Sequence, residues 1–206
     1  MELPLTEPFR RVDESPDSLF YRQPRFVTHI DESAVAAVTQ VYRELLPAGG
    51  AILDLMSSWV SHLPPEVAYG RVVGVGMNQD ELAANPRLDA YAVKDLNREP
   101  LLDFDDDAFD AATICVSIQY LVHPVDVLRE AGRVVRSGGP VIITFSNRCF
   151  PTKAVAIWQA LDDAGHARLI EGYLRDAGNW RDIQSVDRSP KPGFSDPLLT
   201  VVARAI

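Results

Sequence analysis

Short apolar runs alternate with amphipathic segments along most of this chain. Five runs are almost continuously apolar and end in acidic or turn-forming residues, which is typical of the buried strands of a parallel sheet. They span residues 51–54, 71–76, 90–94, 109–118 and 141–145. In the segments between them, apolar residues recur at helical spacing. This alternation predicts parallel strands joined by right-handed helical crossovers.

The two longest helices predicted in the first two thirds of the chain have recognisable ends. Asp31 caps the first, which ends before Pro47, and Pro124 opens another that Gly138 and Gly139 close. Further helices are predicted at residues 79–84, 154–161 and 164–177, and residues 59–65 are predicted to be a short helix or irregular.

Two β runs close the chain. Residues 183–188 and 198–205 are joined by a turn that contains Pro and Gly, which predicts a hairpin. The predicted fold class is therefore α/β, with a single doubly wound sheet of seven mostly parallel strands and a C-terminal antiparallel hairpin.

The beginning of the chain differs from the rest. It is polar and rich in proline, so we divide the sequence into an N-terminal arm, residues 1–30, and an α/β domain, residues 31–206. The last third of the arm holds more aromatic and arginine residues than a free tail would. One interpretation is an arm that covers core surface. The other is a lid over a ligand, with Tyr21, Arg25 and His29 facing inwards.

Composition narrows the possible partners. The 206 residues carry a formal net charge of -9, which argues against binding to the phosphate backbone of nucleic acids. No apolar run approaches the ~20 residues of a membrane span, and the acidic N-terminus does not resemble a signal peptide. The two cysteines make no disulfide framework. We therefore expect a cytoplasmic protein, monomeric or homodimeric, without a membrane or nucleic-acid partner.

Metal binding is not predicted. Cysteine and histidine residues lack the spacing of metal ligands. The acidic run at residues 103–107 is interpreted as a surface turn whose neighbouring side chains diverge, and His62 as an ordinary exposed residue.

Two stretches resemble a known family. Residues 110–114 (DAATI) resemble the fourth strand of class I S-adenosylmethionine-dependent methyltransferases, and residues 128–139 (LREAGRVVRSGG) resemble the helix and glycine turn that follow it. The similarity is greatest to the small-molecule type called methyltransferase type 11, and it covers about residues 51–145. It implies S-adenosylmethionine as cofactor and a small molecule as methyl acceptor.

The resemblance also implies a cofactor site at the ends of the first strands. Asp54 matches the acid that ends the first strand, but Met56, Ser58 and Val60 or nearby residues stand where the family has glycines. Gly76 replaces the acid that pairs with the ribose, and Asn78 is a candidate to bond a ribose hydroxyl instead. The implied cofactor-binding residues are Asp54, Met56, Ser57, Ser58, Gly76, Met77, Asn78, Asp95, Leu96, Asn97 and Ser117. Among these, Asp95 and the backbone N–H of Leu96 would contact the adenine.

Methyl transfer depends mostly on positioning, so no residue is diagnostic of it. The acceptor should lie beyond the carboxyl ends of the fourth and fifth strands. The catalytic candidates there are Tyr120, His123, Asn147 and Arg148. Tyr120 and His123 are candidates to accept a proton, and Cys149 beside Arg148 is a candidate for a lowered thiol pKa.

Two functions stay open on the sequence. One is an S-adenosylmethionine-dependent methyltransferase that acts on a small molecule. The other is a methyltransferase-fold binding or scaffold protein without activity, which the missing glycines and Gly76 favour. A nicotinamide-dependent dehydrogenase fits less well, because the pair Gly74 and Gly76 follows the second strand rather than the first.

Overall fold

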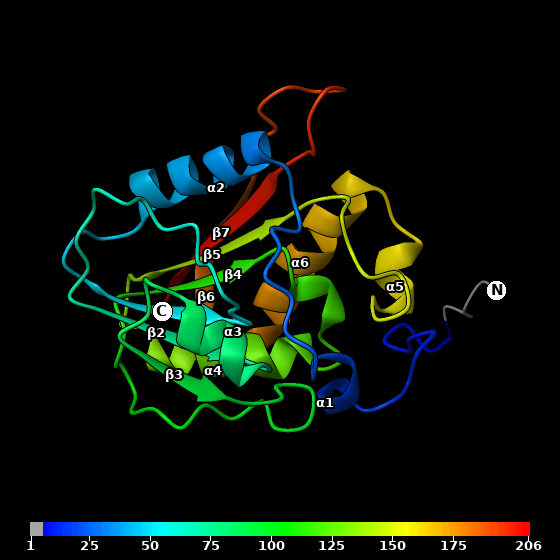
Figure 1. Cartoon of the computed structure of the whole chain (residues 1–206), viewed down its shortest axis with the longest axis horizontal. Helices are drawn as coiled ribbons and strands as arrows, with labels where there is room; N and C mark the ends of the chain where they lie inside the picture. The colour runs from blue at the N-terminus through cyan, green and yellow to red at the C-terminus, as the bar shows by residue number, and fades with distance from the viewer. Residues whose placement is uncertain (1–5) are drawn as a thin grey trace.

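A sheet of seven strands forms the centre of the molecule (Figure 1). The computed structural model describes residues 6–206. Its strands are β1 (Ala51–Leu55), β2 (Arg71–Gly76), β3 (Ala90–Val93), β4 (Ala111–Cys115), β5 (Pro140–Phe145), β6 (Trp180–Asp187) and β7 (Leu199–Ala205). They lie in the order β3-β2-β1-β4-β5-β7-β6. The first five strands pair in parallel, and β7 is antiparallel to both β5 and β6. The predicted fold class is confirmed.

Helices cover both faces of this sheet. The long ones are α2 (Glu32–Leu45), α4 (Pro124–Val134) and α6 (Asp163–Ala177), and the short ones are α1 (Asp17–Phe20), α3 (Gln79–Ala84), α5 (Ala156–Gln159) and the 3₁₀ turn η1 (Ile118–Tyr120). Ile52 of β1 belongs to the apolar cluster under α2, whereas its neighbour Leu53 belongs to the cluster under α4 and α6. Because successive strand residues point to opposite faces, a sheet covered on both sides needs strands that are apolar throughout. Within residues 6–206, no helix is long and apolar enough to cross a bilayer.

The strand predicted at residues 109–118 is wrong at both ends. Phe109 makes only an isolated bridge to Val135, so β4 begins at Ala111. At its other end the chain turns at Val116, whose φ of 48° is incompatible with a strand. The apolar pattern nevertheless continues, because the residues of η1 are buried in the same core.

Two other predicted elements also differ in length. The helix predicted at residues 154–161 is reduced to the single turn α5, and residues 59–65 are irregular. Strand β6 begins earlier than predicted, at Trp180, because a bulge between Arg181 and Gln184 interrupts its alternation of apolar and polar residues.

The described part of the arm, residues 6–30, packs against the body through a buried ionic cluster. Arg11 donates to both carboxylate oxygens of Asp17 at 2.8 Å. Lys153, which has no exposed surface, lies 3.2 Å from a carboxylate oxygen of Asp17 and 3.2 Å from one of Asp13. Burial would raise the pKa of Asp17, but its donors, including Arg11 and Lys153, lower it overall. The cluster fixes the arm beside the exit loop of β5.

We expect Lys153→Met to lower the free energy of unfolding by about 3 kcal/mol, because it leaves buried carboxylates with fewer cationic partners. Urea denaturation measures the change. The control is Arg175→Met, which removes a side chain paired with Glu171 but 60% exposed and should change stability by less than about 0.5 kcal/mol. Equal losses in the two variants would contradict a stabilising role for the cluster.

Candidate functional site

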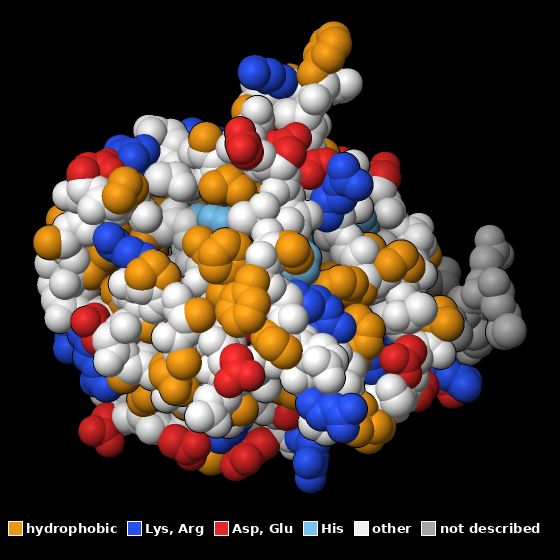
Figure 2. Space-filling model, viewed as in Figure 1, with side chains coloured by type: hydrophobic (Ala, Val, Ile, Leu, Met, Phe, Trp, Pro, Cys, Tyr) orange, Lys and Arg blue, Asp and Glu red, His pale blue; other side chains and the backbone are white. Residues whose placement is uncertain are grey.

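A cavity of about 290 Å³ lies at the carboxyl ends of β1, β2, β3 and β4. In open α/β sheets this edge is where ligands bind. The arm crosses the same edge (Figure 1), and its exposed Phe26 and Val27 lie beside the cavity. Figure 2 shows hydrophobic side chains and histidine gathered near the middle of this face. The cavity therefore has a floor from the sheet and a cover from the arm.

The turn after β1 is organised by Asp54. One of its carboxylate oxygens accepts hydrogen bonds from the hydroxyls of Ser57 at 2.6 Å and Ser61 at 2.7 Å, and the other accepts from Thr113 at 2.9 Å. Burial raises the pKa of Asp54, and the three hydroxyl donors oppose this rise. Met56 has a φ of 55°, so a methionine adopts here the left-handed backbone that glycine favours.

The end of β2 has no room for a side chain. A Cβ on Gly76 would lie 2.2 Å from the carbonyl oxygen of Ser57, and the N–H of Ser57 donates to the carbonyl of Val75 at 2.8 Å. The β1 turn thus rests directly on the backbone of β2. This contact is the physical reason why the acid expected at position 76 is missing.

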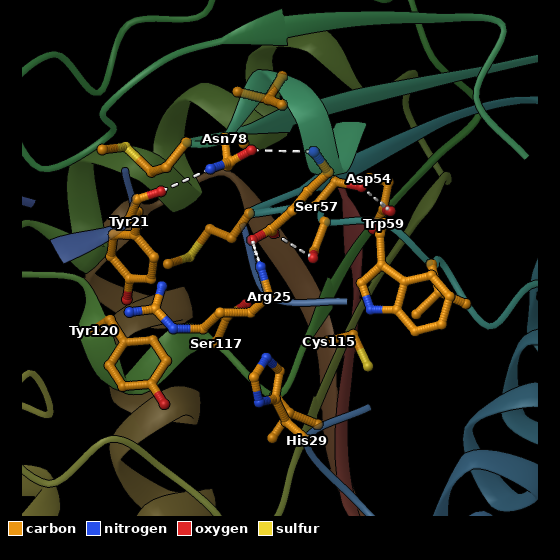
Figure 3. A pocket seen from close by; sticks show the side chains of 18 of the residues that line it. Tyr21, Arg25, His29, Asp54, Ser57, Trp59, Asn78, Cys115, Ser117 and Tyr120 are labelled. Atoms are coloured by element: carbon orange, nitrogen blue, oxygen red, sulfur yellow. Dashed lines mark hydrogen bonds between the residues drawn. The ribbon is translucent and has the colours of Figure 1, made fainter. Parts of the chain in front are cut away.

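Asn78 does not take over the role of that acid. Its side-chain amide donates to the carbonyls of Tyr21 and Arg22 in the arm, and its oxygen caps α3 by accepting from the N–H groups of Asp80 and Glu81 (Figure 3). Both ends of the amide are occupied by protein groups. The expectation that Asn78 bonds a ribose hydroxyl is therefore corrected: it ties the arm to α3.

The end of β3 keeps its acid at the cavity. Asp95 lines the cavity beside Leu96, and one of its carboxylate oxygens accepts from the N–H of Asn97 at 3.0 Å. The Asn97 amide donates to Asp17 in the arm and to the carbonyl of Tyr120. Asp95 and Leu96 are thus placed for a ligand, whereas Asn97 joins the arm to the end of β4.

At the end of β4, Ser117 and Tyr120 differ in what they offer. Ser117 lines the cavity and is 8% exposed, and its hydroxyl is buried with no hydrogen-bond partner among the described residues. The Tyr120 hydroxyl accepts from the N–H of Phe150 at 2.8 Å, and burial raises the pKa of Tyr120 to about 12. The Tyr120 hydroxyl is thus held in its protonated form, which disfavours the proton-accepting role that the sequence suggested.

Of the remaining catalytic candidates, only one reaches the cavity. Arg148 lines it but donates to Asp196 at 2.7 Å. His123 and Asn147 are exposed and do not line it. Burial raises the pKa of Cys149, which corrects the expectation of a lowered value beside Arg148.

The arm brings three side chains to the cavity. Tyr21, Arg25 and His29 all line it, as expected of inward-facing residues (Figure 3). The Arg25 guanidinium lies 4.6 Å from the ring centre of Phe20 and 5.4 Å from that of Phe150. These cation–π contacts hold Arg25 within the wall of the cavity.

His62 and Glu81 are among the cavity residues that the sequence analysis missed. His62 has a φ of 52° and lines the cavity, and burial lowers its pKa, as it does that of His29. Glu81 lies three residues after the cap Asn78, the place of a capping-box glutamate. Its carboxylate instead accepts from Ser58 and from the N–H of Arg25. The spacing predicts a helix cap at Glu81, whereas its contact with the arm is visible only in the folded structure.

Within residues 6–206, no group of three or more histidine, cysteine, aspartate or glutamate side chains is arranged to hold a metal ion.

Comparisons with known proteins agree with this architecture. Residues 57–143 match the family described as methyltransferase domain. The [4+2]-cyclase SpnF superposes with a TM-score of 0.61 at 16% identity, over 82% of this chain and 80% of that one. An S-adenosylmethionine-dependent methyltransferase from Mesorhizobium loti gives 0.58 at 17% identity, over 82% and 97%. No curated protein matches the chain.

A third structure contains the cofactor. Phosphoethanolamine N-methyltransferase 2 from Haemonchus contortus, in complex with S-adenosyl-L-methionine, superposes with a TM-score of 0.60 at 15% identity. The match covers 82% of this chain but 52% of that one, so the present chain corresponds to about half of that protein. At such identities the solved structures establish the fold alone.

We expect Gly76→Ala to lower the free energy of unfolding by about 2 kcal/mol or more, because the added methyl group must displace the β1 turn. Gly172→Ala is the matched control, since a Cβ there meets nothing within 4 Å and alanine is the better helix former by about 1 kcal/mol. Urea denaturation of both variants measures the difference. If Gly76→Ala were as stable as Gly172→Ala, the close approach of Ser57 to Gly76 would be disproved.

Proposed function

We propose that the chain is a class I S-adenosylmethionine-dependent methyltransferase, which binds S-adenosylmethionine in this cavity and methylates a small molecule; the match of residues 57–143 to the methyltransferase-domain family supports this. The observation that carries the proposal is the position of the cavity, at the carboxyl ends of the first four strands and under the arm.

The residues present fit most of this cofactor. The left-handed backbone at Met56 keeps the bend that a glycine would give, so the β1 turn leaves space for the amino-acid portion. The unpartnered hydroxyl of Ser117 is available to the same portion. Asp95 and Leu96 line the part of the cavity where the adenine would lie. The end of β2 is the one place without the expected group, because of Gly76.

When bound, S-adenosylmethionine supplies a methyl group on a positively charged sulfonium. The residues of the chain then have to align the acceptor and exclude water. Burial lowers the pKa of His29 and of His62, which favours the neutral form of both imidazoles. Neutral rings do not repel a sulfonium, and they retain a lone pair that can take a proton from an acceptor.

The arm acts in this proposal as a lid. Tyr21, Arg25 and His29 close the side of the cavity that the sheet leaves open. The ionic cluster around Lys153 holds the start of the arm, and Asn78 holds its middle. Such a cover keeps water from the reacting groups.

A methyltransferase-fold binding protein without transfer activity is the second candidate. One observation favours it: neither Gly76 nor Asn78 offers a free acceptor to a ribose at the end of β2. This candidate and the enzyme differ in turnover, not in architecture.

We expect purified protein to bind S-adenosylmethionine with a dissociation constant below 1 mM in a calorimetric titration, roughly the affinity of a modest cofactor site. Ser117→Ala should weaken binding by up to about tenfold, because one hydrogen bond is lost. Ser185→Ala, on the exposed face of β6, is the matched control and should leave binding unchanged.

Absence of heat at millimolar cofactor would overturn the proposed function. Binding without transfer of a labelled methyl group to any member of a panel of small amines, alcohols and thiols would favour the second candidate.

A further inference from the structure

The end of β2 offers no free side-chain acceptor to the ribose of an adenosyl ligand. In the proposed function the amino-acid portion lies at the β1 turn and the adenine at the end of β3, so the ribose lies between them, beside the end of β2. At that end, Gly76 has no side chain and Asn78 is occupied. A vicinal diol is bound best by a carboxylate, which accepts from both hydroxyls through charge-assisted bonds.

Four carboxylates line the cavity, those of Asp17, Asp54, Glu81 and Asp95. Two of them keep too few free acceptor positions for the two hydroxyls of a diol. Asp17 accepts from Arg11 and Asn97 and is paired with Lys153. Asp54 accepts from three hydroxyls and is 4% exposed. Neither has the freedom to bind a diol.

Among the described residues, Asp95 has one carboxylate oxygen without a hydrogen bond, and it lies at the end of the cavity nearest the sheet edge. It follows β3, the edge strand of the sheet, and it lines the part of the cavity assigned above to the adenine. In the proposed function its free oxygen is therefore assigned to the adenine and not to the ribose.

Glu81 remains, and it is well placed. It lies in the first turn of α3, directly after β2, and its side chain lines the cavity. One carboxylate oxygen accepts from the hydroxyl of Ser58 at 2.6 Å, and the other accepts from the N–H of Arg25 at 2.7 Å. Since a carboxylate can accept about four hydrogen bonds, each oxygen keeps one free lone pair.

We infer that Glu81 is the ribose-binding carboxylate of this protein, supplied from α3 instead of from the end of β2. This inference rests on the proposed function. It also gives Glu81 a second effect, because the same carboxylate holds the arm through Arg25 and the β1 turn through Ser58. A ligand that uses Glu81 therefore binds at the point where the lid meets the floor of the cavity.

The test uses two ligands and three forms of the full chain. The ligands are 5′-methylthioadenosine and its 2′-deoxy analogue, which differ by one ribose hydroxyl. The forms are the wild type, Glu81→Gln and the control Asp80→Asn. Asp80 is exposed on the same turn of α3, so its variant removes an equal charge away from the cavity. Calorimetry gives each affinity, and thermal denaturation checks that each form is folded.

In the wild type and in Asp80→Asn, the 2′-deoxy ligand should bind about tenfold or more weakly, because a charge-assisted hydrogen bond is lost. In Glu81→Gln, 5′-methylthioadenosine should bind more weakly by a similar factor, and the difference between the two ligands should shrink to about threefold or less. If Glu81→Gln keeps the full difference, the diol is bound elsewhere and the inference is wrong. If Glu81→Gln is unfolded, Glu81→Asp, which retains the charge, replaces it. If Glu81→Asp binds 5′-methylthioadenosine as tightly as the wild type and keeps the full difference between the two ligands, the assigned geometry is contradicted.

Failure of the proposed function gives a different result. In that case neither ligand binds the wild type, whatever stands at position 81.

Discussion

The contact between the carbonyl of Ser57 and the backbone of Gly76 is the constraint on which the site depends. It places the β1 turn directly on the end of β2, with the N–H of Ser57 bonded to Val75. The turn is held there by Asp54, whose three hydroxyl partners come from the same turn and from β4. A side chain at position 76 is incompatible with this arrangement. The glycine at position 76 and the serine-rich turn are thus both required by the same packing contact.

The arm forms the part of the cavity wall that the sheet does not supply. Its contacts go to polar groups at the ends of strands or helices: Asn78, Glu81 and Asn97 each bond to it. Buried polar groups must find partners, and here the arm supplies them. In consequence, several side chains at the cavity spend hydrogen bonds on the arm that they could otherwise make to a ligand. Groups without a partner among the described residues, such as the Ser117 hydroxyl, indicate where a ligand can still bind.

The sequence predicted the fold better than the site, and the reason is physical. Strand and helix patterns are local, so the order of elements and the terminal hairpin followed from apolar periodicity and turn residues. The site depends on contacts between distant segments. Asn78 looked available until the carbonyl groups of Tyr21 and Arg22 were found beside it. Cys149 looked activated by Arg148, but burial dominates its pKa. Neither effect is visible in residue spacing.

The most direct test of the account is a crystal structure of the protein with S-adenosylhomocysteine. We predict the β1 turn still resting on Gly76 and the ribose hydroxyls within hydrogen-bond distance of the Glu81 carboxylate. A ligand whose ribose lies at the end of β2 after the turn has moved away from Gly76, or a cavity filled by the side chain of Met56 or Trp59, would contradict it.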